Sequence, residues 1–117
     1  MAIIRLVLCA LALLFAPAAQ AQQEVHLELM LLADASGSID NAEIRFQRQG
    51  YAAAITHPEV LNAIAGGLLQ KIAVTYVEWG DSGSQEVVVP WTVIDGPAAA
   101  QAVADKLKAH PETSVVS

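Results

Sequence analysis

Apolar and polar positions divide the chain into three strand-like and three helix-like segments. Residues 25–33 begin with alternating apolar and polar positions and end in a continuous apolar run. This pattern predicts a strand that is half exposed at first and then buried on both faces. Burial on both faces is typical of a central parallel strand covered by two layers of helices. We therefore expect a ligand site at the carboxyl end of this strand.

Helical spacing begins directly after the turn that follows this strand. Asp40 and Glu43 have the spacing of a capping box, which predicts a helix that starts at residue 41. The helix should end at His57-Pro58, because the residue before a proline resists helical angles. A second, short helix with Thr56 as its cap should stop at Gly66-Gly67, and a third is expected over residues 97–110.

The other two strands are predicted over residues 71–79 and 85–94. The short loop between them favours an antiparallel hairpin. Pro90 cannot donate a hydrogen bond to a strand ladder, so its strand should lie at a sheet edge. Glu78, a lone carboxylate, is interpreted as an edge or hairpin residue. The fold class expected is α/β, with a mostly parallel sheet, an antiparallel edge strand and helices on both faces.

The first 21 residues have the pattern of a secretory signal peptide. Arg5 precedes an apolar core over residues 6–16, and Ala19-Gln20-Ala21 fits a cleavage site before Gln22. The apolar run is shorter than the ~20 residues of a membrane span, so no stable membrane insertion is expected after cleavage. Cys9 would leave with the signal. We expect export to the periplasm or the cell exterior.

The net charge of residues 22–117 limits the classes of partner that the chain is expected to bind. Without Arg5, residues 22–117 hold 5 basic and 12 acidic side chains, a net charge of −7. Such an excess of negative charge disfavours nucleic acids and anionic membrane surfaces as partners. It is compatible with cation binding and with basic protein partners. Net charge alone does not distinguish these two possibilities.

The turn after the first strand carries the candidate chemistry. Asp34, Ser36 and Ser38 stand at alternate positions, so a carboxylate and two hydroxyls can point into one small space. Oxygen ligands of this kind suit a hard cation, Mg²⁺ first and then Mn²⁺ or Ca²⁺. The alternative is a turn of small polar residues that only caps the next helix.

The D-x-S-x-S spacing resembles the metal-ion-dependent adhesion site of von Willebrand factor A domains. The predicted order of elements is similar to the opening half of that fold. The segments Thr75-Tyr76-Val77-Glu78-Trp79 and Val89-Pro90-Trp91 look like an uncharacterised group of secreted bacterial proteins with a von Willebrand factor A-like fold. The resemblance covers residues 25–117 and implies a Rossmann-like sheet.

The resemblance also implies a ligand set. Asp34, Ser36 and Ser38 match the first metal-binding loop, and Thr113 stands where the second loop supplies a threonine, although without the usual glycines. The aspartate of the third loop has no counterpart. We therefore expect residues 22–117 to form a partial domain with weak cation affinity and an open strand edge that favours aggregation.

The implied function is recognition: a partner protein would offer a carboxylate that completes the shell of the bound cation. We expect an adhesion-type module and not an enzyme. One alternative is a structural domain of an envelope complex in which the metal only rigidifies the loop. Another is a serine hydrolase at Ser82, because Gly80-Asp81-Ser82-Gly83-Ser84 is similar to the nucleophile loop of trypsin-like proteases. That reading needs a histidine base, and His57 is interpreted as structural.

Overall fold

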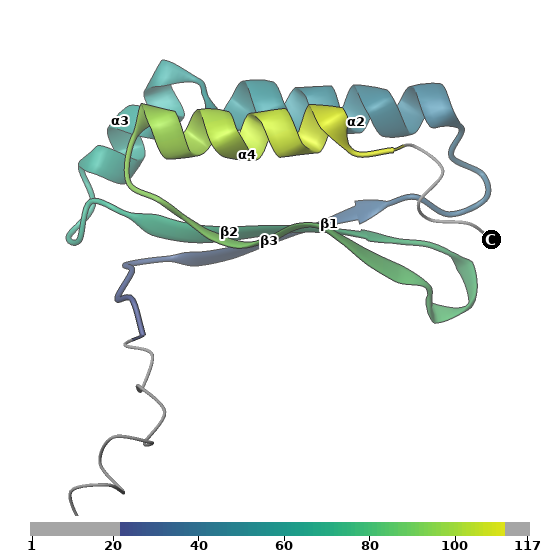
Figure 1. Ribbon diagram of the computed structural model, residues 1–117, viewed down its shortest axis with the longest axis horizontal. Helices are drawn as coiled ribbons and strands as arrows, with labels where there is room; N and C mark the ends of the chain where they lie inside the picture. The colour runs from purple at the N-terminus through teal and green to yellow at the C-terminus, as the bar shows by residue number, and fades with distance from the viewer. Residues whose placement is uncertain (1–21, 112–117) are drawn as a thin grey trace, which may run out of the picture.

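The computed structural model describes residues 22–111, which form a small α/β structure (Figure 1). None of the helices in this range is long and apolar enough to cross a membrane. In chain order the elements are β1 (Glu28–Asp34), α2 (Asn41–Ile55), α3 (Pro58–Ala65), β2 (Ile72–Trp79), the 3₁₀ turn η1 (Asp81–Gly83), β3 (Gln85–Ile94) and α4 (Pro97–Ala109). The predicted element order is confirmed.

The three strands form one mixed sheet in the order β1-β2-β3. β1 runs parallel to β2, and β2 pairs with β3 as an antiparallel hairpin. The prediction from Pro90 is confirmed, because β3 lies at an edge of the sheet. The sheet has one parallel pair only, so the expectation of a mostly parallel sheet is not met within residues 22–111.

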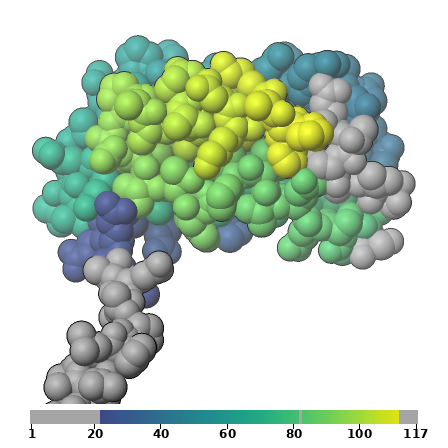
Figure 2. All heavy atoms as spheres, in the orientation of Figure 1, coloured from purple at the N-terminus to yellow at the C-terminus, as the bar shows by residue number. Residues whose placement is uncertain are grey.

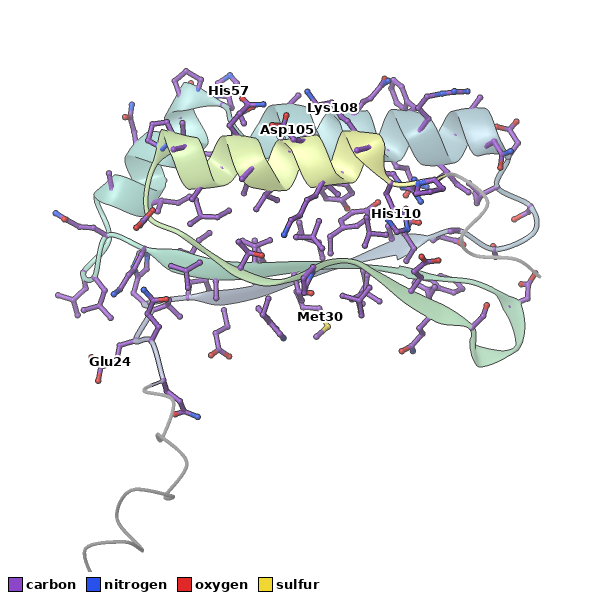
Figure 3. All side chains as sticks on the ribbon, viewed as in Figure 1. Glu24, Met30, His57, Asp105, Lys108 and His110 are labelled. Atoms are coloured by element: carbon purple, nitrogen blue, oxygen red, sulfur yellow. The ribbon has the colours of Figure 1, made fainter. Side chains whose placement is uncertain are left out.

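All three helices of the described range lie on one face of the sheet (Figure 1). This corrects the prediction of helices on both faces and of a central first strand. In β1, Leu29 and Leu31 pack against the core, whereas Met30 and Leu32 are 52% and 59% exposed. Figure 3 shows Met30 pointing away from the helices. A strand that is apolar on both faces favours burial of both faces. The pattern does not indicate which element covers the face that points away from the helices.

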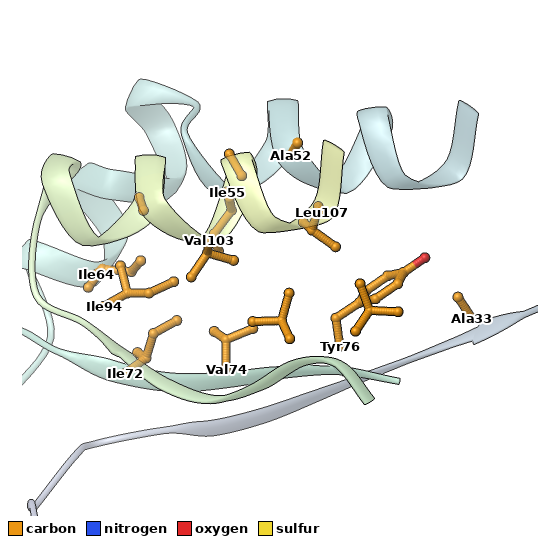
Figure 4. Close-up of a cluster of buried hydrophobic side chains, with 14 residues drawn as sticks. Ala33, Ala52, Ile55, Ile64, Ile72, Val74, Tyr76, Ile94, Val103 and Leu107 are labelled. Carbon is orange, nitrogen blue, oxygen red and sulfur yellow. The ribbon is translucent and has the colours of Figure 1, made fainter. Parts of the chain in front are cut away.

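The hydrophobic core fills the space between the helices and the sheet (Figure 4). Tyr76, Val89, Ile94 and Ala100 are fully buried. The Tyr76 ring meets the ring of Tyr51 edge to face, with ring centroids 5.1 Å apart. In the space-filling view α4 lies directly against the strand beneath it (Figure 2). The core therefore fixes the sheet beneath the helices and with it the ends of the strands.

Local capping sets where the helices begin. The Glu43 N–H donates to Asp40 Oδ1 and the Asp40 N–H donates to Glu43 Oε2, both at 2.8 Å, which confirms the capping box. For α3 the predicted Thr56 cap is wrong. His57 caps this helix by accepting from the Glu59 N–H at 3.2 Å, while the Thr56 hydroxyl donates back to a carbonyl of α2. The Thr56 hydroxyl is engaged by carbonyls of α2, so the histidine side chain that follows it satisfies the free amide of α3.

Candidate metal centre

The loop Asp34–Asp40 lies at the carboxyl end of β1. In the parallel register Asp34 is opposite Trp79, the last residue of β2. The Ala35 N–H donates to the Trp79 carbonyl at 2.8 Å, which continues the pairing by one residue. The carboxyl ends of two neighbouring parallel strands therefore meet at this edge, as is typical of ligand sites in α/β sheets.

The structure brings Asp34, Ser36 and Ser38 together. The Ser36 N–H donates to Asp34 Oδ1 at 2.9 Å, and the Ser36 and Ser38 hydroxyl oxygens are 3.4 Å apart. Hydrogen bonds from the Ser36 hydroxyl, and then from its N–H, lower the pKa of Asp34. The carboxylate is thus ionised at neutral pH and lies beside two neutral oxygen donors.

Two other elements brace this loop. Gln47 Nε2 of α2 donates to the Asp34 carbonyl at 3.0 Å. On the other side, the Gly37 N–H donates to Asp81 Oδ2 of η1 at 3.0 Å. A Cβ at position 37 would lie 3.1 Å from that same oxygen, so glycine permits the close approach. The loop is held by the protein itself at both its start and its middle.

Asp81 is a residue of the site that the sequence analysis missed. Its segment was interpreted as a turn between two strands or, alternatively, as a loop similar to the nucleophile loop of trypsin-like proteases. A signal was present, because η1 directly follows β2 and β2 ends beside β1. Polar residues after neighbouring parallel strands converge at one sheet edge. The signal could be interpreted only once β1 and β2 were known to be neighbouring parallel strands.

The donor set fits a hard cation. The clustered donors are one carboxylate and two hydroxyls, which are oxygen ligands of the type that Mg²⁺ and Ca²⁺ take. Within residues 22–111, no three His, Cys, Asp or Glu side chains are grouped to hold a metal ion. Thr113, the predicted ligand of a second loop, lies outside the described residues.

A buried ion pair lies behind the loop, between α2 and β2. Arg48 Nη2 and Nε donate to Glu78 Oε1 and Oε2 at 2.6 and 2.8 Å. Glu78 pairs with Glu86 in the β2–β3 hairpin, as predicted, but it lies on the middle strand and is 1% exposed, so it is not an edge residue. The whole side chain of Arg48 is buried, including its guanidinium. The hydrogen bonds to Glu78 raise the pKa of Arg48, so the guanidinium stays charged although it is buried.

His57, the histidine upstream of the loop over residues 80–84, lies far from that loop. His57 caps α3, and Figure 3 shows it at the opposite end of the molecule from the β2–β3 turn that contains residue 82. Its Nδ1 is engaged by a backbone amide. The structure therefore gives His57 the structural role expected for it.

The fold and the loop define a small α/β protein with a cluster of oxygen donors at the carboxyl ends of two parallel strands. The chain belongs to the DUF1194 family, which carries the description "protein of unknown function". The family model matches residues 24–116. No curated protein matches the chain. No solved structure matches it either.

The Asp34 carboxyl group should titrate below its ordinary value of 3.8, because Ser36 hydrogen bonds to the ionised form. A lowered pKa in the folded state means that this group stabilises the fold above pH 3.8 and loses that effect as the pH falls through the lowered value. Carboxyl-carbon NMR should show that Ser36→Ala raises the midpoint. Thr92→Ala serves as the control and should leave it unchanged. An identical midpoint in Ser36→Ala would contradict the role of the hydroxyl.

Proposed function

We propose that this chain is an exported, cation-dependent protein-binding module of the von Willebrand factor A type. The observation that carries the proposal is the convergence of Asp34, Ser36 and Ser38 at the carboxyl ends of β1 and β2. In this proposal the three residues hold Mg²⁺, or Mn²⁺ or Ca²⁺, and Thr113 adds a further hydroxyl. The mixed sheet is then part of a Rossmann-like sheet.

The donor chemistry favours recognition over turnover. Asp34 supplies a single negative charge, and the two serines supply neutral oxygens. A bound divalent cation would therefore keep a net positive charge and an open position for a carboxylate of a partner protein. The serine hydroxyls and the Asp34 carboxylate fix where that partner group would approach.

An exposed aromatic residue beside the loop supports a protein partner. Trp79 ends β2 opposite Asp34 and is 41% exposed. Tryptophan is enriched among the residues that contribute most to binding at protein interfaces. A partner that reaches the loop with a carboxylate would meet this side chain at the same sheet edge.

The bracing of the loop favours adhesion over a purely structural role for the metal. Gln47 and Asp81 already hold the loop by hydrogen bonds at 3.0 Å. A cation is therefore not required to order the loop, and chelator should leave the melting temperature almost unchanged. If chelator instead unfolded the chain, the structural reading would be favoured.

Isothermal titration with Mg²⁺ tests the proposal. Residues 22–117 should bind with a dissociation constant on the order of a millimolar, because few charged ligands hold the ion. Asp34→Ala should abolish the binding and Ser38→Ala should weaken it. Asp95→Ala removes the same charge from an exposed turn and should bind as the wild type does. Equal affinities in the wild type and Asp34→Ala would overturn the proposed cation site.

A further inference from the structure

The two edge strands of the sheet, β1 and β3, differ in how readily a further strand can pair with them. β3 contains Pro90, which lacks an N–H, and its register with β2 shifts on both sides of Tyr76. Prolines and irregular registers are among the features that protect an edge strand from further pairing. β1 pairs with β2 in one unbroken register over residues 28–34 and contains neither proline nor lysine. The free edge of β1 is therefore the one open to a further strand.

The backbone groups on this edge form a regular row. Two hydrogen bonds show which groups face β2: the Leu27 carbonyl accepts from β2 at 2.9 Å, and the Ala35 N–H donates to β2 at 2.8 Å. Because backbone groups alternate in direction along a strand, those of residues 28, 30, 32 and 34 point away from β2. Gln47 of α2 donates to the Asp34 carbonyl at 3.0 Å and so closes one end of the row. The N–H and C=O groups of residues 28, 30 and 32 remain directed toward an added strand.

An apolar groove lies between β1 and α3. It has a volume of about 350 Å³, and its lining includes Leu27, Leu29, Val60, Ala63 and Ile64. Leu29 points toward the helices but is only partly buried. Alternate side chains of a strand added to β1 would point to this same side, because the strands of a sheet share one pleat. The groove therefore suits apolar side chains at alternate positions of the added strand.

The other side of β1 indicates the charge of the partner. Glu28, Met30, Leu32 and Asp34 alternate with the residues that face the helices, and Figure 3 shows Met30 pointing away from the helices. This side of β1 therefore has a carboxylate at each end and apolar side chains between them. Opposite charges on neighbouring strands favour pairing, and like charges oppose it. A strand with a basic side chain near each end is thus complementary to β1.

A second copy of the chain fits this edge less well. Antiparallel pairing of two β1 strands over their full length would place Glu28 of each copy opposite Asp34 of the other copy. Like charges would then lie opposite each other at both ends of the pair. The edge, unlike the face of the sheet, therefore favours a different chain with basic ends.

We propose that the free edge of β1 is a further binding surface, at which a strand of a partner protein extends the sheet. The partner segment is extended, has apolar side chains at alternate positions on the side of the groove, and has a basic side chain near each end. Hydrogen bonds to the backbone of residues 28, 30 and 32 give affinity, while the groove and the two carboxylates select the side chains. No cation is needed for this pairing, so it is independent of the candidate metal centre.

A synthetic peptide with blocked ends, Lys-Val-Thr-Val-Thr-Val-Lys, tests this surface. It has the seven-residue length of β1, and its valines and its lysines lie on opposite faces when it is extended. Amide exchange of residues 22–117 is followed by NMR with chelator present and at low chain concentration. Without peptide, the N–H groups of Met30 and Leu32 should exchange faster than those of Leu29 and Leu31, which face β2. Peptide at about 1 mM should slow the exchange at Met30 and Leu32 about threefold or more.

Two control peptides and two matched variants show what holds the strand. The same peptide methylated at every backbone nitrogen keeps its side chains and should give no protection. Glutamate in place of both lysines should weaken binding about tenfold, because two favourable charge pairs become repulsive. Glu28→Lys should weaken binding of the lysine peptide and strengthen binding of the glutamate peptide. Glu24→Lys makes the same charge change outside β1 and should alter neither.

Three results would overturn the proposal. The first is unchanged exchange at Met30 and Leu32 with peptide present. The second is equal protection by the methylated peptide, because binding would then not use the backbone edge. The third is protection of Met30 and Leu32 that rises with chain concentration in the absence of peptide, because the occupant would then be a second copy. A chain that binds the peptide but not Mg²⁺ would overturn the proposed function and support this surface.

Discussion

Residues 22–117 should self-associate at micromolar concentration through the uncovered sheet face, the side on which no helix of residues 22–111 lies, defined here as Met30, Leu32, Val87 and Trp91. These four side chains lie on the two edge strands and are between 51% and 59% exposed. Contiguous apolar patches on a protein surface favour association, and an edge strand without a covering element adds unpaired backbone groups. Because β1 and β3 both contribute, the patch spans the width of the sheet.

Analytical ultracentrifugation would measure this association. Leu32→Glu/Val87→Glu places a carboxylate on each edge strand and should shift the chain to a monomer. Phe46→Glu is the matched control, because Phe46 is 78% exposed but lies on α2, away from the uncovered sheet face. A wild-type chain that sediments as a monomer at every concentration would contradict the prediction.

Replacing Glu78 alone by leucine should destabilise the fold by about 3–5 kcal/mol, because it leaves the buried Arg48 charge without its carboxylate. A loss of this size is a large fraction of the ~5–15 kcal/mol that stabilises a typical domain. Changing Arg48 to methionine in the same chain should recover most of the loss. The recovery would show that the cost comes from the unpaired charge and not from the lost side-chain volume.

Urea unfolding at low protein concentration, where association is suppressed, would measure these differences. The exposed pair of Lys108 and Asp105 provides the comparison, and its removal should change the free energy of unfolding by about 1 kcal/mol or less. A Glu78→Leu variant as stable as the wild type would mean that water or another group compensates the Arg48 charge.

Local chemistry made the elements predictable. The capping box at Asp40 and Glu43 and the proline that marks β3 as an edge strand each act within a few residues. Such signals depend on backbone angles and free amides, which the neighbouring sequence sets. The same holds for the candidate metal loop, whose three donors lie within five residues and meet in one turn.

Partners distant in sequence escaped prediction. The Gly37 amide meets Asp81 across 44 residues, and Arg48 meets Glu78 across 30. The burial of Glu78 was not predicted, because acidic side chains are seldom buried without a partner and no pattern along the chain identifies the partner. Only the pairing of β1 with β2 and the packing of α2 on the sheet bring these groups together.

Patterns along the chain were sufficient to predict the succession of strands and helices, the edge position of β3 and the oxygen donors at Asp34, Ser36 and Ser38. Contacts between distant segments set which face of the sheet the helices cover, which charges are buried and what holds the loop and the end of α4. Periodicity indicates only which side of an element prefers burial. What lies against that side is set by contacts between segments, which no local pattern contains.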